Sequence, residues 1–305
     1  MAITLPRALG VDLRGRSLAR VRDWTAAELE AVLDLADELK EKQRSRKPHR
    51  LLEGRTLGLL FRKHSTRTRV SLEVAAAHLG ATALYLSDDQ LQLARGEPFE
   101  DTARVLSRYL DAIAIRTFAH AEIETFAAAA TIPVFNALTD EAHPLQALTD
   151  LQTMRERFGS VEGLRVAWIG DGNNVCLSLA EACALFGAEL VCAAPEGYEP
   201  DDPSILVVRD PKEAVAGAQV VVTDVWTSMG QEAEHAERLR AFSGYTVDDE
   251  LLALADADAI VLHCLPAHPG EEISADVLYG PRSAAWDEAE NRLHTAKALL
   301  ALTVA

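Results

Sequence analysis

The chain has 305 residues, of which 49% are hydrophobic and 25% are charged, the ordinary balance of a globular protein. This length is enough for two α/β domains of about 150 residues each, or for one large domain. The formal net charge of −17 argues against broad electrostatic attraction to nucleic acid or to an anionic membrane surface, so any local cluster of positive charge is informative.

The cysteines and the N-terminus indicate the compartment. Cys176, Cys183, Cys192 and Cys264 form no CxxC pair, so free thiols in a reducing compartment are expected. The first 30 residues lack the apolar segment of a signal peptide, and no apolar run approaches the roughly 18–20 residues of a transmembrane helix. We therefore expect a cytoplasmic protein that contacts neither membrane nor nucleic acid.

In the first half of the chain, short apolar runs of strand length alternate with segments of helical periodicity. The predicted strands are Thr56–Phe61, Ala83–Leu86, Ala112–Arg116 and Pro133–Leu138. The predicted helices include Val70–Leu79, Pro98–Leu110 and Ala121–Ala130.

A helix predicted at Leu145–Phe158 separates this series from a second series of strands. The second series comprises Arg165–Gly170, Glu189–Ala194, Ile205–Val208, Val220–Asp224 and Ile260–Leu265. The alternation predicts an α/β protein of two domains, each a mainly parallel sheet flanked by helices, divided into residues 1–145 and 146–285. A final helix within residues 286–305 is expected to pack back on the first domain.

Unusual polar residues recur where the predicted strands end. In open α/β sheets, ligands collect beyond the carboxyl ends of the strands. The segments concerned are His64–Arg69, Arg116 and His143 in the first half, and Asp171–Asn174, Asp224–Ser228 and Cys264 in the second. This agreement predicts an active site in the cleft between the two domains.

The segment from Phe61 to Arg69 lies between a strand and a helix and suits an anion. It carries Arg62, Lys63, Arg67 and Arg69 together with the hydroxyls of Ser65, Thr66 and Thr68. Cations at a helix N-terminus are unfavourable, because they lie at the positive end of the helix dipole. An anion bound there makes the interaction favourable. The structural alternative is a solvated charged turn with Ser65 as N-cap. The segment lacks GxxxxGK[ST], so it is not a P-loop.

Two motifs carry a family resemblance. Ser65-Thr-Arg-Thr-Arg69 resembles the SxRTR motif of the aspartate and ornithine carbamoyltransferases, and His143-Pro-Leu-Gln146 resembles their HPxQ motif. The resemblance covers nearly the whole chain, with the motifs in the family's order. It implies that residues 1–145 bind carbamoyl phosphate and that residues 146–285 bind the amine substrate.

The resemblance also implies a set of site residues. Those for carbamoyl phosphate are Ser65, Thr66, Arg67, Thr68, Gln92, Arg116, His143, Gln146, Cys264, Leu265 and Arg292. The residues implied in the chemistry are Arg116, His143, Cys264 and Asp224. These roles agree with the chemistry of carbamoyl transfer. An oxyanion forms at the carbonyl carbon, and preorganised hydrogen-bond donors aimed there lower the barrier.

Three further segments resemble the ornithine branch: Gly170-Asp-Gly-Asn-Asn174, Asp224-Val-Trp-Thr-Ser-Met-Gly230 and His263-Cys-Leu-Pro266. They imply ornithine-binding roles for Asn174, Asp224, Ser228 and Met229. The expected reaction is transfer of the carbamoyl group to the δ-amine of L-ornithine, giving L-citrulline and phosphate without a cofactor. A homotrimer, or a multiple of trimers, is implied, with Gln92 and Arg95 acting across an interface.

One departure from the relatives follows Gly197-Tyr-Glu-Pro200. Relatives usually have a helix before the next strand, whereas here Asp201–Ser204 leads almost directly to Ile205–Val208. A helix is therefore expected to be missing from the second domain.

Several alternatives remain open. His263, Cys264 and His268 invite a zinc interpretation, but their spacing matches neither a closed four-ligand set nor HExxH, so no metal is expected. The amine could be putrescine or a modified ornithine; aspartate is disfavoured because its second carboxylate would meet Asp224. Val166–Gly172 suggests an NAD-linked dehydrogenase, although the loop is not GxGxxG. A catalytically silent member of the family is the last alternative.

Overall fold

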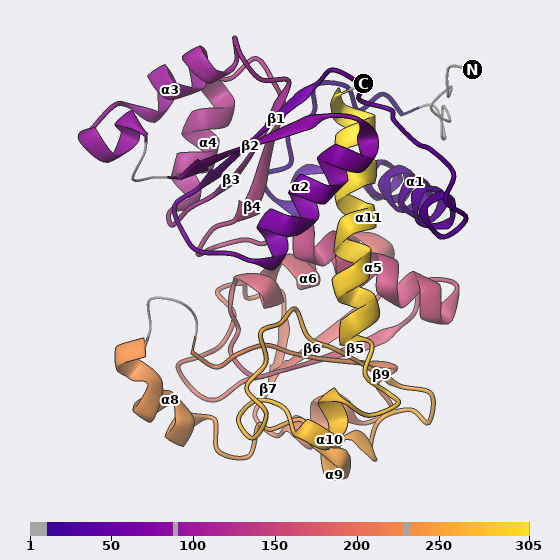
Figure 1. The fold of residues 1–305 in the computed structure, drawn as a ribbon. Helices are drawn as coiled ribbons and strands as arrows, with labels where there is room; N and C mark the ends of the chain where they lie inside the picture. Colours follow the sequence, from indigo (N-terminus) through magenta and orange to yellow (C-terminus); the bar gives the residue numbers. More distant parts are fainter. Residues whose placement is uncertain (1–10, 88–90, 228–231, 305) are drawn as a thin grey trace. The chain divides into compact units, whose positions relative to one another are not determined.

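The computed structural model describes residues 11–87, 91–227 and 232–304 (Figure 1). The chain divides into two compact units: unit 1 is Met1–Gln152 with Glu290–Ala305, and unit 2 is Thr153–Ala289. Both divisions fall inside long helices, α5 (Pro144–Phe158) and α11 (Ala285–Val304). Each of these helices therefore contributes residues to both units.

Unit 1 contains a four-stranded parallel sheet. Its strands are β1 (Thr56–Phe61), β2 (Thr82–Ser87), β3 (Ala112–Arg116) and β4 (Val134–Leu138), in the order β2-β1-β3-β4. The chain passes from β1 to β2 on one side and then returns to β3 on the other. The strand order therefore reverses between β1 and β3, and such a switch point is where open α/β sheets bind ligands.

The helices of unit 1 cover this sheet and close its core. They are α1 (Ala26–Arg44), α2 (Arg67–Leu79), η4 (Gln92–Arg95), α3 (Phe99–Leu106) and α4 (His120–Ala129), besides the parts of α5 and α11. Helix α2 packs against β1 and β2, and α3 packs against α4. The apolar residues of β3, such as Ile113 and Ile115, are fully buried with Phe126 of α4. Burial on this scale holds the loop after β1 in place.

Unit 2 contains a five-stranded parallel sheet. Its strands are β5 (Arg165–Ile169), β6 (Glu189–Ala193), β7 (Leu206–Val208), β8 (Val220–Thr223) and β9 (Ile260–Leu262), in the order β7-β6-β5-β8-β9. The order reverses between β5 and β8, which places the residues after these two strands at the switch point.

The helices of unit 2 are mostly short. They are α6 (Asn174–Phe186), α7 (Pro211–Val215), η5 (Glu232–Glu234), α8 (His235–Ala241), α9 (Asp249–Leu252) and α10 (Ala275–Leu278). No helix joins β6 to β7, which confirms the prediction of a missing helix after Pro200. The connecting segment instead packs on Gly172, where a Cβ would lie 2.1 Å from the backbone nitrogen of Pro200. Only glycine fits there.

All nine predicted strands form, and three boundaries differ from the prediction by three residues or more. Helix α2 begins at Arg67 rather than Val70, so Arg67 and Thr68 belong to its first turn. Helix α3 ends at Leu106 rather than Leu110, where Ser107 begins a turn. Strand β9 ends at Leu262, because Leu265 has a left-handed backbone with φ of 56° that no strand accommodates.

Within the described part of the chain, no helix combines the length and apolar character needed to cross a membrane.

Candidate active site

The start of α2 follows β1 directly and presents backbone N–H groups of its first turn. Thr66 is the N-cap and its side chain makes no capping hydrogen bond; the first turn holds no acidic residue. Ser65 is therefore not the N-cap of this helix, as the structural alternative had it. Uncapped N–H groups at the positive end of a helix are suited to a phosphate.

Three of the four cations in this segment already have carboxylate partners. Arg62 pairs with Glu122 at 2.6 Å, Lys63 pairs with Asp140, and Arg69 pairs with Glu73 at 2.9 Å. Arg67 is exposed in the first turn of α2, and no ion pair joins it to a carboxylate in the described residues. Arg67 is thus the cation at this helix start that is available to an added anion.

A buried polar cluster lies in unit 1, and Arg292 of α11 is at its centre. One guanidinium nitrogen, Nη2, donates to Thr68 Oγ1 and to His143 Nε2, both at 2.9 Å, and the other, Nη1, donates to Gln146 Oε1. Gln146 in turn donates to Asp150 Oδ1 at 2.7 Å. All of these side chains are buried, so the network holds a positive charge out of water. A buried guanidinium is costly unless it is hydrogen-bonded or interacts with negative charge, so this network is suited to an anion.

The geometry assigns a protonation state to His143. Arginine has no acceptor, so His143 Nε2 must accept from Arg292 and the ring proton must reside on Nδ1. Burial, followed by the charges of Arg292 and Arg116, lowers the pKa of His143 well below its usual value. His143 is therefore a neutral imidazole at physiological pH, able to donate from Nδ1.

Arg116 ends β3 beside this cluster. Arg116 is buried, with 5% of its surface exposed. Its carbonyl oxygen accepts a hydrogen bond from the Arg62 backbone N–H at 2.9 Å. The register between β3 and β4 shifts between Ile115 and Arg116, which turns the strand at this position. The polar side chains that lie at the switch point between β1 and β3 are thus those of Thr68, Arg116, His143 and Arg292.

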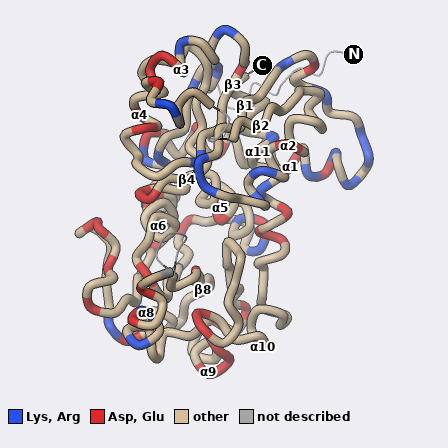
Figure 2. The backbone as a smooth tube through the Cα atoms, turned by 60° about the vertical axis from the view of Figure 1, so that its left-hand side comes forward, with Lys and Arg blue, Asp and Glu red and all other residues tan. Residues whose placement is uncertain are grey.

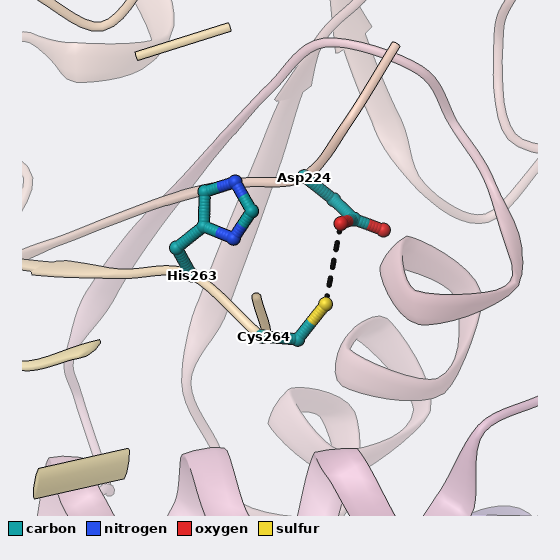
Figure 3. Close-up of side chains that lie close together, drawn as sticks. All are labelled: Asp224, His263 and Cys264. Atoms are coloured by element: carbon teal, nitrogen blue, oxygen red, sulfur yellow. Dashed lines mark hydrogen bonds between the residues drawn. The ribbon is translucent and has the colours of Figure 1, made fainter. Parts of the chain in front are cut away.

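The second cluster lies in unit 2 and surrounds Asp224, the residue after β8 (Figure 3). Asp224 Oδ1 accepts from the Cys264 thiol at 3.2 Å and from the Val225 N–H at 2.9 Å. Its Oδ2 accepts from Asn173 Nδ2 at 2.9 Å. The thiol of Cys264 is thus a hydrogen-bond donor here. A buried carboxylate with polar neighbours is suited to an ammonium group.

Asn173 is a site residue that the sequence analysis missed, because the motif pointed to Asn174. Asn173 is the N-cap of α6: its Oδ1 accepts from the N–H groups of Val175 and Cys176 at 2.9 and 3.1 Å. This leaves its amide nitrogen to donate to Asp224. The signal was present, because an asparagine before a helical run is a favoured N-cap. Asn174 is the first residue of α6.

His263 holds the segment that follows β9. Its Nδ1 accepts from the Leu265 N–H at 2.9 Å, so its Nε2 carries the proton and donates to Glu272 at 3.0 Å. Both ring and carboxylate are fully buried. Leu265 keeps the left-handed backbone noted above, and this bond stabilises it. Cys264 is thereby presented toward Asp224 (Figure 3).

Some expected site residues are not brought to either cluster. Gln92 is exposed in η4, with no recorded contact to Thr68, His143 or Arg292. Ser228 and Met229 lie outside the described residues. Asp171 has a different role from a substrate ligand: it pairs with Arg238 of α8 at 2.8 Å, and burial raises its pKa to about 6.

The comparisons with known proteins show the family to which the chain belongs. Residues 16–156 match the family model described as aspartate/ornithine carbamoyltransferase, carbamoyl-P binding domain, and residues 162–303 match the Asp/Orn binding domain of the same family. These two matches together cover most of the chain.

Among relatives, the ornithine carbamoyltransferase of Pyrococcus horikoshii is 51% identical over 306 residues and covers 96% of each chain. That of Geobacter sulfurreducens is 51% identical over 297 residues, covering 94% of this chain and 98% of its own. The solved ornithine carbamoyltransferase from Pyrococcus furiosus superposes with a TM-score of 0.93 at 50% identity, covering 96% of this chain and 98% of its own. The chain therefore belongs to the aspartate/ornithine carbamoyltransferase family.

Proposed function

We propose that this chain transfers the carbamoyl group of carbamoyl phosphate to the δ-amine of L-ornithine, giving L-citrulline and phosphate. The observation that carries the proposal is the carboxylate of Asp224, buried beside Cys264 and Asn173 in the domain that this family uses for its amine substrate. An acidic group suits the ammonium groups of ornithine, whereas a second substrate carboxylate would be repelled. The relatives at about 50% identity carry the name ornithine carbamoyltransferase.

Carbamoyl phosphate is proposed to bind at the start of α2. Ser65, Thr66 and Arg67 meet the phosphate together with the first N–H groups of the helix. Arg67 supplies the cation, because its neighbours Arg62, Lys63 and Arg69 are paired with carboxylates.

The carbonyl oxygen is proposed to face Thr68, Arg116 and His143. Thr68 Oγ1 accepts from Arg292, so its own hydroxyl proton can be donated elsewhere. His143 is neutral and carries its proton on Nδ1, which makes it a donor rather than a second cation. Arg292 and Gln146 hold these groups in place before the substrate arrives, and preorganised donors are worth on the order of 10²–10³ in rate each.

In the proposed reaction, the δ-nitrogen attacks the carbonyl carbon and forms the new C–N bond. The carbon–oxygen bond to phosphate then breaks, and phosphate departs with the electron pair. Before the attack the ammonium loses one proton to solvent, because its unperturbed pKa is near that of lysine, about 10.4. After the attack the nitrogen carries a positive charge, and the departing phosphate takes one of its two protons. Asp224, Asn174, Ser228 and Met229 hold the remainder of ornithine. Cys264 and Leu265 line the reaction centre.

We also propose a homotrimer, or a multiple of trimers, in the cytoplasm. Gln92 then acts at the site of a neighbouring subunit, and its exposure in η4 is compatible with that role. All four cysteines are free thiols, which is compatible with a reducing compartment.

The test is a citrulline assay with purified protein and carbamoyl phosphate. A panel of ornithine, putrescine, an α-N-acylated ornithine and aspartate as acceptors identifies the amine. We expect kcat/KM for ornithine to exceed that for every other amine by at least about 10². A higher value with another acceptor would replace ornithine, and turnover with none of them would refute the proposal.

A further inference from the structure

The segment that joins β1 to α2, residues 62–66, lies in neither a helix nor a strand, although it carries the proposed phosphate ligands Ser65 and Thr66. Its backbone is tied to the sheet at its first residue, where the Arg62 N–H donates to the Arg116 carbonyl at 2.9 Å. A phosphate held by backbone N–H groups and short hydroxyl side chains needs those groups in one arrangement. The contacts that hold this segment therefore bear on phosphate affinity.

The side chain of Arg62 holds the segment through Glu122 of α4. Arg62 Nη1 donates to Glu122 Oε1 at 2.6 Å and to Thr117 Oγ1 at 3.4 Å, and the Thr117 hydroxyl donates to the other oxygen of Glu122. Figure 2 shows the cations of the segment after β1 in blue and the acidic residues of α4 in red. Each side chain of the ion pair is 24% exposed, so solvent screens it less than a fully exposed pair. Glu122 thus joins the segment after β1 to Thr117, which directly follows β3.

Two aromatic rings contact the same guanidinium. Arg62 Cζ lies 5.7 Å from the ring centre of Phe99, at the start of α3, and 5.6 Å from that of Phe118. The Phe118 ring also lies 4.6 Å from Lys63 Nζ. A cation at such a distance is attracted to the face of an aromatic ring. A carboxylate and two rings therefore restrict the direction of the Arg62 side chain.

The loop after β4 is joined to the same group. Lys63 pairs with Asp140, and the Asp140 N–H donates to the Phe118 carbonyl at 2.9 Å. This loop leads to His143, and the loop after β3 begins at Arg116, and both residues are proposed to face the carbonyl oxygen. The three loops that carry proposed carbamoyl phosphate ligands are thus joined through the contacts of two neighbouring cations.

We propose that Arg62 is a positioning residue for carbamoyl phosphate. Paired with Glu122, it holds residues 65–67 in the arrangement that the phosphate requires, at a fixed place beside Arg116. Arg62 does not itself meet the substrate, because its guanidinium is engaged by Glu122 and by the two rings. This role rests on the function proposed above.

The rival explanation is that Arg62 attracts the phosphate by its charge alone. The two explanations predict opposite results for Glu122→Gln, which removes the carboxylate and leaves the guanidinium. If charge decides, the uncompensated cation strengthens phosphate binding. If position decides, phosphate binding weakens, because Arg62 is no longer held.

The test measures two constants with the full-length protein: KM for carbamoyl phosphate in citrulline formation, and, independently of turnover, Kd for inorganic phosphate by calorimetry. We expect Arg62→Met and Glu122→Gln each to raise both constants roughly tenfold, because ligands that are no longer preorganised must be ordered on binding. By contrast, kcat and KM for ornithine should change less than about threefold, because neither is set by the order of the phosphate ligands.

Two combined variants separate the pair from its members. The double variant Arg62→Met with Glu122→Gln should be no weaker than either single variant, because all three lose one and the same interaction. Arg62→Glu with Glu122→Arg should recover most of the affinity that Arg62→Glu loses, because it restores the pair with its charges exchanged. Glu122→Gln keeps the side-chain volume, so the sign of its effect decides the matter even if Arg62→Met folds poorly.

Arg55 and Asp111 provide the matched control, because they join the same two strands at their other ends. Arg55 precedes β1, Asp111 precedes β3, and their side chains pair at 2.8 Å. Whatever its effect on the melting temperature, Arg55→Met should leave both constants unchanged.

Tighter phosphate binding in Glu122→Gln would overturn the positioning role, as would unchanged constants in Arg62→Met or an equal rise of both constants in Arg55→Met. An unsubstituted protein that forms no citrulline but binds phosphate would refute the proposed function, and the phosphate titrations would still decide the role of Arg62. An unsubstituted protein that binds no phosphate would overturn both.

Discussion

Arg292 Nη2 donates to His143 Nε2 at 2.9 Å, although the two residues are 149 positions apart in the chain. This contact fixes the tautomer of the histidine, because arginine only donates. Burial, followed by the charges of Arg292 and Arg116, lowers the pKa of His143. The final helix thus sets the chemistry of a loop that comes much earlier in the chain.

Replacing Arg292 should therefore change the protonation of His143. In Arg292→Gln, the pKa of His143 should rise while remaining below its usual value, because one of the two cations that lower it is gone and burial and Arg116 remain. We expect kcat to fall on the order of 10²–10³ as the donor geometry is lost. Imidazole NMR shifts against pH measure the pKa, and Arg292→Lys should retain the depressed value. A His143 pKa unchanged in Arg292→Gln would contradict this account.

Arg67→Ala should weaken carbamoyl phosphate specifically. Loss of a charge-assisted bond of about 1.5–3 kcal/mol corresponds to a rise of roughly 10–100-fold in KM for carbamoyl phosphate. Arg69→Ala, two residues later on the same helix, is the control, because Arg69 pairs with Glu73 and stacks on Tyr85. If steady-state kinetics showed that both substitutions raise KM for carbamoyl phosphate equally, Arg67 would not be the specific cation of the phosphate site.

Asp224→Asn should affect the amine rather than carbamoyl phosphate. The substitution removes the charge but keeps the side-chain volume, so kcat/KM for ornithine should fall at least about 10²-fold while binding of carbamoyl phosphate changes little. Cys264→Ser retains a donor to Asp224 and should be less impaired than Cys264→Ala. If Asp224→Asn weakened the binding of carbamoyl phosphate more than that of ornithine, Asp224 would not be a residue of the amine site.

Lys297 should make the stability of the protein depend on pH. It is fully buried, and its ammonium meets neutral acceptors, including Gln43 Oε1 at 2.9 Å. Burial lowers its pKa from 10.5 to about 8. Between about pH 8 and pH 10.5 the unfolded chain therefore holds a proton that the folded chain has lost, so the free energy of unfolding rises with pH in that window.

Lys297→Met should remove this rise and should stabilise the protein at pH 7 by about 1–3 kcal/mol. Urea unfolding at pH 7 and at pH 10 measures both effects, with the exposed Lys47→Met as control. A Lys297→Met protein less stable than the unsubstituted protein at pH 7 would show that the bonds to α1 outweigh the cost of burying the charge.

Local patterns in the sequence were sufficient to locate the strands. Apolar runs of strand length located all nine strands, because buried parallel strands need apolar residues on both faces. Periodicity did not locate the start of α2 at Arg67, since cations and hydroxyls obscure the pattern in the first turn. It also extended β9 to Leu265, whose apolar side chain conceals a left-handed backbone.

The sequence by itself determined an α/β chain with two parallel sheets, and it predicts an anion site at the start of α2 and an acidic position for an amine at Asp224. Tertiary structure alone decided which polar side chains meet: Arg292 with His143, Asn173 with Asp224, and Arg62 with Glu122. The physical reason is that strand and helix periodicity depends on neighbours a few residues apart. The partner of a buried polar group is instead set by the packing of elements that are distant along the chain.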